Sequence, residues 1–415
     1  MNDPAQAAAA GSGRDRLILL TGLITYGVGQ TLLIVIFGPM ARELGLSDVQ
    51  FGALISASNL VIIFSSPRWG FASNGLGRRT VFVVGLLGFA AGYAGFAFGI
   101  QAGLWGWFSA SPLLGLAFAT PLFLMLLAAR LLYGVFAGAV QPAASAYIAD
   151  TTDRASRAKG MALVAASGGL GSILGPVVGG LLAEIHPLAP FYAVATFSIL
   201  VAFWAHTQLV EPQRHESPDT GPKMQFTDRR VLPYLFGWFA IFLVFTGIQT
   251  ITAFFVEDRI GITGEQAIIR VTSLAVFCMA IVTVIVQIGV MQLLKLQPRT
   301  LLRYSLICFG LSIWVLSQAE TLPMLFISYA LMGLTASFAM PSLSAAASLS
   351  VEAHEQGAAA GLITAAPAVG MIFGPFMATV FYDQSALMPM YIGGAVMVLT
   401  GIAFWFVNMP IAPDK

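Results

Sequence analysis

The residues of this 415-residue chain that could do chemistry are polar side chains placed inside long apolar runs. Arg130 lies in the middle of such a run, where a cation costs at least about 2.5–3.5 kcal/mol on insertion scales. Neutral polar residues occupy comparable positions in other runs: Tyr26, Gln30, Asn59, Gln141 and Gln249. We predict that these groups bind a substrate or couple its movement to a proton. For Arg130 the alternative is a structural role, buried between helices for hydrogen bonding alone.

Helical periodicity places several of these residues on shared faces. Arg130 and Gln141 fall on one stripe, so we expect them to face one cavity. Tyr26 and Gln30 share a second stripe, and Gln249 shares a third with aromatic residues one to three turns before it. The pattern is typical of an aromatic-lined cavity for a bulky amphipathic substrate. Plain core or lipid-facing packing would produce the same aromatic stripes.

Residue types needed for catalysis are missing or scattered. The four histidines form no cluster, the two cysteines lie in apolar runs without metal spacing, and no phosphate-binding loop is present. We therefore expect a protein that is not an enzyme, has no metal or other cofactor, and carries no ATP-driven motor. No Asp or Glu lies clearly at mid-membrane, which favours a neutral or anionic substrate over a cation.

Composition indicates that lipid covers most of the surface. Hydrophobic residues make up 58% of the chain and charged residues only 9%, against about 25% charged in an ordinary globular domain. The formal net charge of +1 gives no basic excess for nucleic acid. The expected partners are the lipid bilayer, protons and a small molecule, with the protein acting as a monomer.

A helix needs about 20 apolar residues to cross the hydrocarbon core. The apolar runs predict an all-α integral membrane protein with twelve spans, at 17–40, 49–72, 80–101, 119–149, 158–183, 189–208, 231–256, 266–291, 300–318, 322–350, 358–382 and 387–410. The domain organisation expected from these runs is an N-terminal tail over 1–16, disordered over 1–13, a six-helix bundle over 17–208, a flexible linker over 209–230, a second bundle over 231–410 and a tail over 411–415.

Positive charge predicts the orientation of the chain. Of the 20 Lys and Arg residues, all but four fall on the side that holds both termini and the linker. The exceptions are Arg42, Arg259, Arg270 and the embedded Arg130. Because cytoplasmic loops carry an excess of Lys and Arg, both tails and the linker are predicted to be cytoplasmic, in a cell inner membrane.

An internal repeat relates the two predicted bundles. Small and polar residues of the first half recur in the second at one constant offset of 199 residues: Gly134, Pro142, Ser145, Gly171, Gly175 and Pro176 match Gly333, Pro341, Ser344, Gly370, Gly374 and Pro375. Chance is an unattractive explanation for six matches without a gap. Parallel repeats of six helices are a transporter architecture with the substrate path between the halves.

Three motifs resemble those of the major facilitator superfamily. The loop after the second span carries Gly70, Asn74, Gly77, Arg78 and Arg79, similar to the family's G-x-x-x-D-[RK]-x-G-[RK]-[RK] pattern, with Asn74 in place of the acid and Gly75 in place of a base. The resemblance implies that this loop, with Asp150 at the end of the fourth span, holds the cytoplasmic gate. The loss of the acid puts the charge-dependent part of that gate in question.

The other two motifs lie on the fourth and fifth spans. Arg130 and Gly134 match the family's R-x-x-x-G pattern, with Tyr133 where a Gln is common. The fifth span matches, without a mismatch, the G-x-x-x-G-P-x-x-G-G motif of the drug:proton antiporter branch through Gly171, Gly175, Pro176, Gly179 and Gly180. The family uses this helix at the moving seam between its halves.

The resemblance implies the twelve-helix major facilitator fold and secondary active transport by alternating access. The leading hypothesis is proton-coupled efflux of a small amphipathic compound, such as a drug or a siderophore. The alternative is a proton-coupled uptake symporter for an organic anion or another nutrient, which Arg130 and the missing embedded acid keep open. A membrane receptor or scaffold is a third and weaker alternative.

Overall fold

The computed structural model of the chain describes residues 4–108, 120–152, 157–212, 224–290, 297–352 and 355–407. Within these ranges all regular structure is helical. Twelve of the helices are long and apolar enough to cross a membrane. The predicted all-α class and the twelve spans are therefore confirmed for the described part of the chain.

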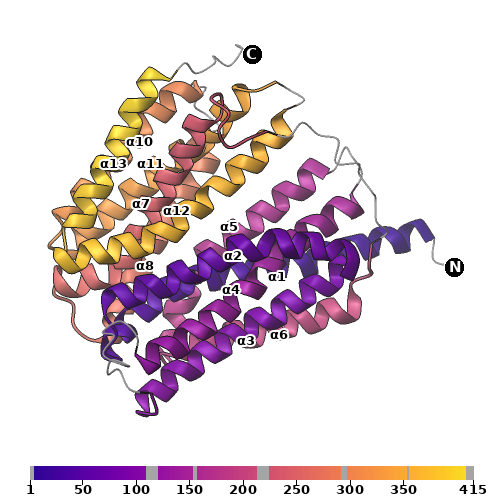
Figure 1. The fold of residues 1–415 in the computed structure, drawn as a ribbon, viewed down its shortest axis with the longest axis horizontal. Helices are drawn as coiled ribbons and strands as arrows, with labels where there is room; N and C mark the ends of the chain where they lie inside the picture. Colours follow the sequence, from indigo (N-terminus) through magenta and orange to yellow (C-terminus); the bar gives the residue numbers. More distant parts are fainter. Residues whose placement is uncertain are drawn as a thin grey trace. The chain divides into compact units, whose positions relative to one another are not determined.

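The helices follow the predicted spans closely (Figure 1). The first set comprises α1 Pro4–Glu43, α2 Asp48–Leu76, α3 Arg78–Leu104, α4 Pro121–Thr151, α5 Arg157–Ala183 and α6 Ala189–Gln208. The second comprises α7 Leu232–Asp258, α8 Glu265–Ile285 with a π turn η1 at Val286–Val290, α10 Pro298–Ser317, α11 Leu322–Leu349, α12 Gln356–Gln384 and α13 Met388–Phe406.

The first helix begins earlier than predicted. The sequence predicts a disordered segment over 1–13 and a first span from residue 17, whereas α1 already starts at Pro4 and its membrane-length segment starts at Gly13. Proline suits the first helical position and four consecutive alanines follow closely, the strongest helix formers. The predicted C-terminal tail, 411–415, lies outside the described residues.

The chain forms two compact units. The first contains Met1–Gln50 and Ala57–Ser217, and the second contains Phe51–Ser56 and Pro218–Lys415. The change of unit after Ser217 falls inside the predicted linker over 209–230. The described ends of this linker are held by side-chain contacts rather than free, as detailed below.

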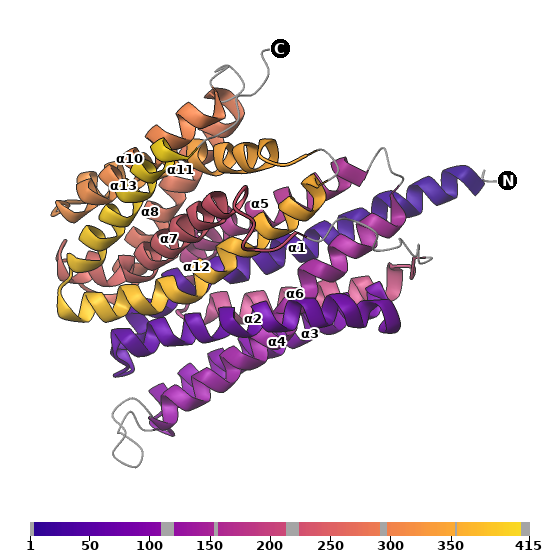
Figure 2. The ribbon, with the colours of Figure 1, turned by 45° about the horizontal axis from the view of Figure 1, so that its top comes forward.

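Helix pairing repeats from one unit to the other. In the first unit α1 packs on α5, and α3 packs on α4 and α6. In the second, α7 packs on α12, and α10 packs on α11 and α13 (Figure 2). These are the same pairs when the helices of each set are counted from one to six, so the repeat seen in the sequence extends to the packing.

The matched glycines mark a shared contact inside each unit. In the first, the Ser65 hydroxyl of α2 donates to the carbonyl oxygen of Gly134 on α4, at 3.0 Å. In the second, the Thr283 hydroxyl of α8 donates to the carbonyl oxygen of Gly333 on α11, at 3.1 Å. The two glycines are the residues matched at an offset of 199 in the sequence, and each lets the neighbouring helix approach its backbone.

Candidate functional site

Helix α4 places Arg130 in the interior of the first unit, with its side chain 5% exposed. Its Nη2 donates to the hydroxyl of Ser58 on α2 at 2.6 Å. The guanidinium carbon lies 4.1 Å from the ring centroid of Tyr133 and 6.0 Å from that of Phe96. Tyr133 stands one helical turn after Arg130 on α4. It occupies the position where the family pattern has Gln, and sequence reasoning gave it no role.

The charge of Arg130 is only partly compensated. Its Nε is buried and has no hydrogen-bond partner. Among the described residues no carboxylate forms an ion pair with it. The aromatic faces contribute about 0.5–2 kcal/mol each by cation–π attraction, which is less than the penalty for an unpaired buried charge. An anionic group next to Arg130 would therefore stabilise it.

An aromatic cluster joins Arg130 to the predicted polar residues of α1. The Phe89 ring of α3 lies 5.2 Å from the Tyr133 ring and 5.9 Å from the Tyr26 ring, centroid to centroid. Gln30 donates through Nε2 to the Tyr26 hydroxyl at 2.6 Å. The structure thus gathers three of the predicted site residues around one set of rings.

The other predicted site residues stand apart from this cluster or border it. Asn59 is buried directly after Ser58 on α2, beside the Arg130 contact in sequence. Gln141 is exposed, whereas Arg130 is buried, and about 16 Å of helix separates them at 1.5 Å per residue. The two side chains thus differ in exposure, and the cavity expected to be shared by them stays a prediction. Gln249 is buried on α7 in the second unit.

The loop between α2 and α3 is built around one glycine and one ion pair. Gly77 has φ +99° and ψ 147°, a conformation open to glycine and costly for other residues. It lets the chain turn directly into α3, where the Arg78 Nε lies 2.9 Å from Oδ2 of Asp150. The same guanidinium donates to the Ser73 hydroxyl. Asp150, which the sequence analysis groups with this loop, thus pairs with its Arg78, whereas Asn74 is exposed.

Glu211 supplies a negative charge to this loop, although it lies 133 residues after Arg78 along the chain. Its carboxylate accepts from the backbone N–H groups of Arg78 and Arg79, the latter at 3.1 Å. These N–H groups lie at the start of α3 and have no acceptor within the helix, and the helix dipole also favours an anion there. Arg79 in turn donates to the carbonyl oxygen of Leu209 at 3.2 Å. The first residues of the predicted flexible linker are therefore tied to the first unit.

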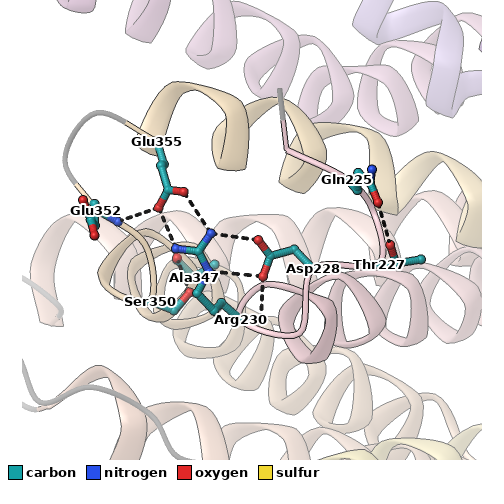
Figure 3. A network of polar contacts seen from close by, with 8 residues as sticks. All are labelled: Gln225, Thr227, Asp228, Arg230, Ala347, Ser350, Glu352 and Glu355. Carbon is teal, nitrogen blue, oxygen red and sulfur yellow. Dashed lines mark hydrogen bonds and ion pairs between the residues drawn. The ribbon is translucent and has the colours of Figure 1, made fainter. Parts of the chain in front are cut away.

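The second unit carries a charged network at the start of α7 and α12 (Figure 3). Arg230 lies 2.8 Å from Asp228 and 2.7 Å from Glu355, measured between the nearest nitrogen and oxygen atoms. Hydrogen bonding to Arg230 lowers the pKa of the Asp228 carboxyl below its ordinary value, and the two carboxylates raise the pKa of Arg230. The other end of the predicted linker is thus also held in place.

The glycine motif of α5 packs against α1 inside the first unit. A Cβ added to Gly175 would lie 2.7 Å from the carbonyl oxygen of Val28, and one added to Gly171 would collide with the carbonyl oxygen of Ile24. A Cβ added to Gly179 would meet the side chains of Leu32 and Ile36, which also belong to α1. The motif therefore brings two backbones into direct contact. Gly180 and Pro176 lie on the same helix, half-buried and buried respectively.

Twelve candidate membrane helices in the described residues, arranged as two sets with the same pairing, define a multi-pass membrane protein with the architecture of a secondary transporter. The profile of the Major Facilitator Superfamily matches residues 19–299 and 270–415. The chain belongs to this superfamily, whose members are transporters and not enzymes.

Individual relatives cover nearly all of the chain. Multidrug resistance protein 1 of Bacillus subtilis (strain 168) is 27% identical over 394 residues, which is 93% of this chain and 94% of the relative. Tetracycline resistance protein, class C, of Escherichia coli is 28% identical over 396 residues, 90% and 91% of the two chains.

Solved structures agree with the fold. A D-xylose-proton symporter matches with a TM-score of 0.74 at 16% identity, over 94% of this chain and 97% of that one. The human organic anion transporter MFSD10 matches with a TM-score of 0.63 at 19% identity, over 94% and 99%. At these identities the likeness establishes the fold and leaves the substrate open.

Proposed function

We propose that the chain is a proton-coupled efflux carrier of the cell inner membrane that exports a small amphipathic compound by alternating access. The observation that carries this proposal is the similarity to a multidrug and a tetracycline resistance protein over at least 90% of the chain. The unbroken glycine motif on α5, which resembles that of drug:proton antiporters, supports the outward direction.

The interior cluster around Arg130 supplies the chemistry such a carrier needs. Aromatic rings of Tyr26, Phe89 and Tyr133 offer apolar contact, while Gln30 and Asn59 offer hydrogen bonds. Arg130 is the charged member and takes part in substrate binding or in coupling to the proton. Gln249 and Gln141 are proposed as outlying polar contacts.

In alternating access the two six-helix halves rock about a central site. The pair Arg78–Asp150 and the Glu211 cap hold the loop between α2 and α3, which we assign to the cytoplasmic gate. The α5 glycines, in direct backbone contact with α1, form a surface on which helices can shift. Both termini lie in the cytoplasm, and the carrier works as a monomer.

Proton flux in vesicles tests this function. Purified protein is reconstituted, a pH gradient is imposed, and a quenched dye reports proton movement as cationic dyes, tetracyclines, siderophores and simple carboxylates are added in turn. Proton flux opposite to substrate movement, lost in Arg130→Ala, is the expected result. No substrate-dependent flux for any compound would contradict the proposal.

Uptake is the second candidate, because a buried arginine without an ion-paired carboxylate in the described residues suits an imported organic anion. In the same vesicles, protons and substrate would then move in one direction. Concentrative uptake by intact cells would favour this symporter over the exporter.

A further inference from the structure

We infer that Arg130 binds a carboxylate of the transported compound, so that the carrier prefers organic anions and carboxylate-bearing zwitterions. This inference rests on the proposed transport function and adds the substrate class. In this inference the anionic partner of Arg130 is the substrate and not another group of the protein.

The first support is the incomplete surroundings of the cation. Arg130 is 5% exposed, Nη2 has an acceptor in Ser58, and Nε is buried without one. The hydroxyls of Tyr93 and Tyr133 also lie within electrostatic reach of the guanidinium, but a neutral phenol brings no opposing charge. The protein part of the site thus supplies uncharged polar groups and aromatic faces, and it lacks an anion among the described residues.

The second support comes from the repeat. The offset of 199 residues that relates Gly134 to Gly333 takes position 130 to Tyr329 on α11. Tyr329 is fully buried, and its hydroxyl is hydrogen-bonded to that of Thr252 within the second unit. The same helical framework is therefore completed at this position by an uncharged residue whose polar atom is satisfied inside the protein.

Comparison of the two units shows which contacts are needed for helix packing and which are not. One turn along the helix, both units use the same contact, a hydroxyl bonded to the glycine carbonyl oxygen. Packing at this level therefore needs no cation four residues earlier. An arginine kept buried with an unsatisfied Nε carries a cost that the second unit avoids. A ligand bearing the missing negative charge would offset that cost in the first unit.

A carboxylate fits this position better than other anions that a membrane carrier meets. It is planar and matches the guanidinium fork with two parallel hydrogen bonds. The rings of Tyr133 and Phe96 lie beside the guanidinium and would contact an aromatic or aliphatic body attached to the carboxylate. An aromatic or amphipathic carboxylic acid satisfies both requirements.

Matched acids and esters test the inference directly. The probes are 1-naphthoate and its methyl ester, and a fluoroquinolone with a free carboxylate and its methyl ester, all intrinsically fluorescent. Binding at pH 7 is measured by equilibrium dialysis with the full chain in lipid nanodiscs, and empty nanodiscs correct for partition into lipid. In the wild type each acid should bind at least about tenfold more tightly than its ester, because hydrogen bonds to charged groups are strong.

Three variants test whether Arg130 causes the preference for the acid over its ester. In Arg130→Gln the acid-to-ester ratio should fall to within about twofold, while Arg130→Lys should retain an intermediate ratio because it keeps the charge without the planar fork. Tyr329→Phe, at the matched position of the second unit, should leave the ratio unchanged. A thermal unfolding curve for each variant verifies that it is folded, and Arg130→Lys covers the case in which Arg130→Gln is not.

The outcomes distinguish this inference from the proposed function. Equal binding of acid and ester by the wild type, including no binding of either, would overturn the inference, as would a ratio that survives in Arg130→Gln. If the vesicles still show substrate-dependent proton flux in that case, the transport function stands without the carboxylate site. Acid-selective binding without any flux would support the carboxylate site and contradict the transport function.

Discussion

Among single residues, Gly77 shows how one backbone conformation fixes a whole polar cluster. Its positive φ aims the N–H groups of Arg78 and Arg79 at the Glu211 carboxylate, and an ideal Cβ on Gly77 would lie 2.7 Å from that carboxylate. The ion pair of Arg78 with Asp150 starts from the same turn. Backbone strain and steric crowding would therefore both oppose any larger residue at position 77.

Gly77→Ala should lower the free energy of unfolding by about 1–3 kcal/mol, the usual cost of a sparsely populated backbone conformation. The matched control is Gly75→Ala in the last turn of α2, where an added Cβ meets nothing within 4 Å. Because Gly75 is helical, alanine there should be neutral or stabilising by up to about 1 kcal/mol. Thermal unfolding of both purified variants checks the pair, and equal melting temperatures would contradict the prediction.

The hydrogen bond between Arg230 and Asp228, at the start of α7, predicts that the stability of the folded protein depends on pH. This hydrogen bond lowers the pKa of Asp228 in the folded state, so this stabilisation is present above the unfolded value of about 3.9 and is lost as pH falls through the folded pKa. The wild type should therefore lose more thermal stability than Asp228→Asn when the pH is lowered from 7 to 3.

The Asp228 prediction has an internal control. Arg230→Gln should reduce the same acid sensitivity at least as strongly, because it removes the ion pair with Glu355 as well as that with Asp228. Adding Asp228→Asn to Arg230→Gln should then change the acid sensitivity little further. Parallel melting curves for wild type and Asp228→Asn across this pH range would show that the hydrogen bond does not affect stability.

The sequence predicted some of these residues and missed others for a physical reason. Arg130 could be found because a charge in an apolar run is conspicuous. Glu211 could not, since it caps a helix that begins 133 positions earlier and nothing local distinguishes it from linker residues. Gln141 stays a predicted site residue, because a stripe shared with Arg130 gives direction around the helix and leaves depth along it open.

At the scale of helices, the length and hydropathy of the apolar runs predict where each helix begins and ends. Small residues indicate which helices pack against each other. The spans were predictable because a lipid core imposes a minimum apolar length. The pairing of α1 with α5 required a further signal, the glycines of the α5 motif, which meet backbone atoms of α1 at Val28 and Ile24. The seam between the halves, which the resemblance implies for α5, stays a prediction.

Matched glycines should behave alike in the two units. An added Cβ would lie 2.7 Å from the Val28 carbonyl oxygen at Gly175, and 2.5 Å from that of Leu243 at Gly374. Gly175→Ala and Gly374→Ala should each lower the free energy of unfolding by about 1–3 kcal/mol, because one helix must move off the other. Apparent melting temperatures in detergent measure the effect.

Controls for this pair lie on the same two helices. Gly169→Ala on α5 and Gly361→Ala on α12 place the new methyl group where nothing lies within 4 Å. They should be neutral or slightly stabilising, since alanine favours helix over glycine. A large loss at Gly175 with none at Gly374 would show that the repeat does not extend to the energetics of packing.

For the whole molecule, the twelve spans and the charge distribution together predict the orientation in the membrane. An even number of spans puts both termini on one side, and all but four of the 20 Lys and Arg residues are assigned to that side. Positively charged loops stay in the cytoplasm. An error of one span would move every later loop to the other side and erase this asymmetry.

Two threonines at opposite ends of α7 make the orientation measurable. Thr227 precedes the helix and Thr263 follows it, and both are exposed. In a background where Cys278 and Cys308 are replaced by alanine, a membrane-impermeant maleimide should label Thr263→Cys in intact cells. It should label Thr227→Cys only after the cells are permeabilised. The reverse pattern would place both termini outside the cytoplasm, and labelling of both in intact cells would mean that α7 does not span the membrane.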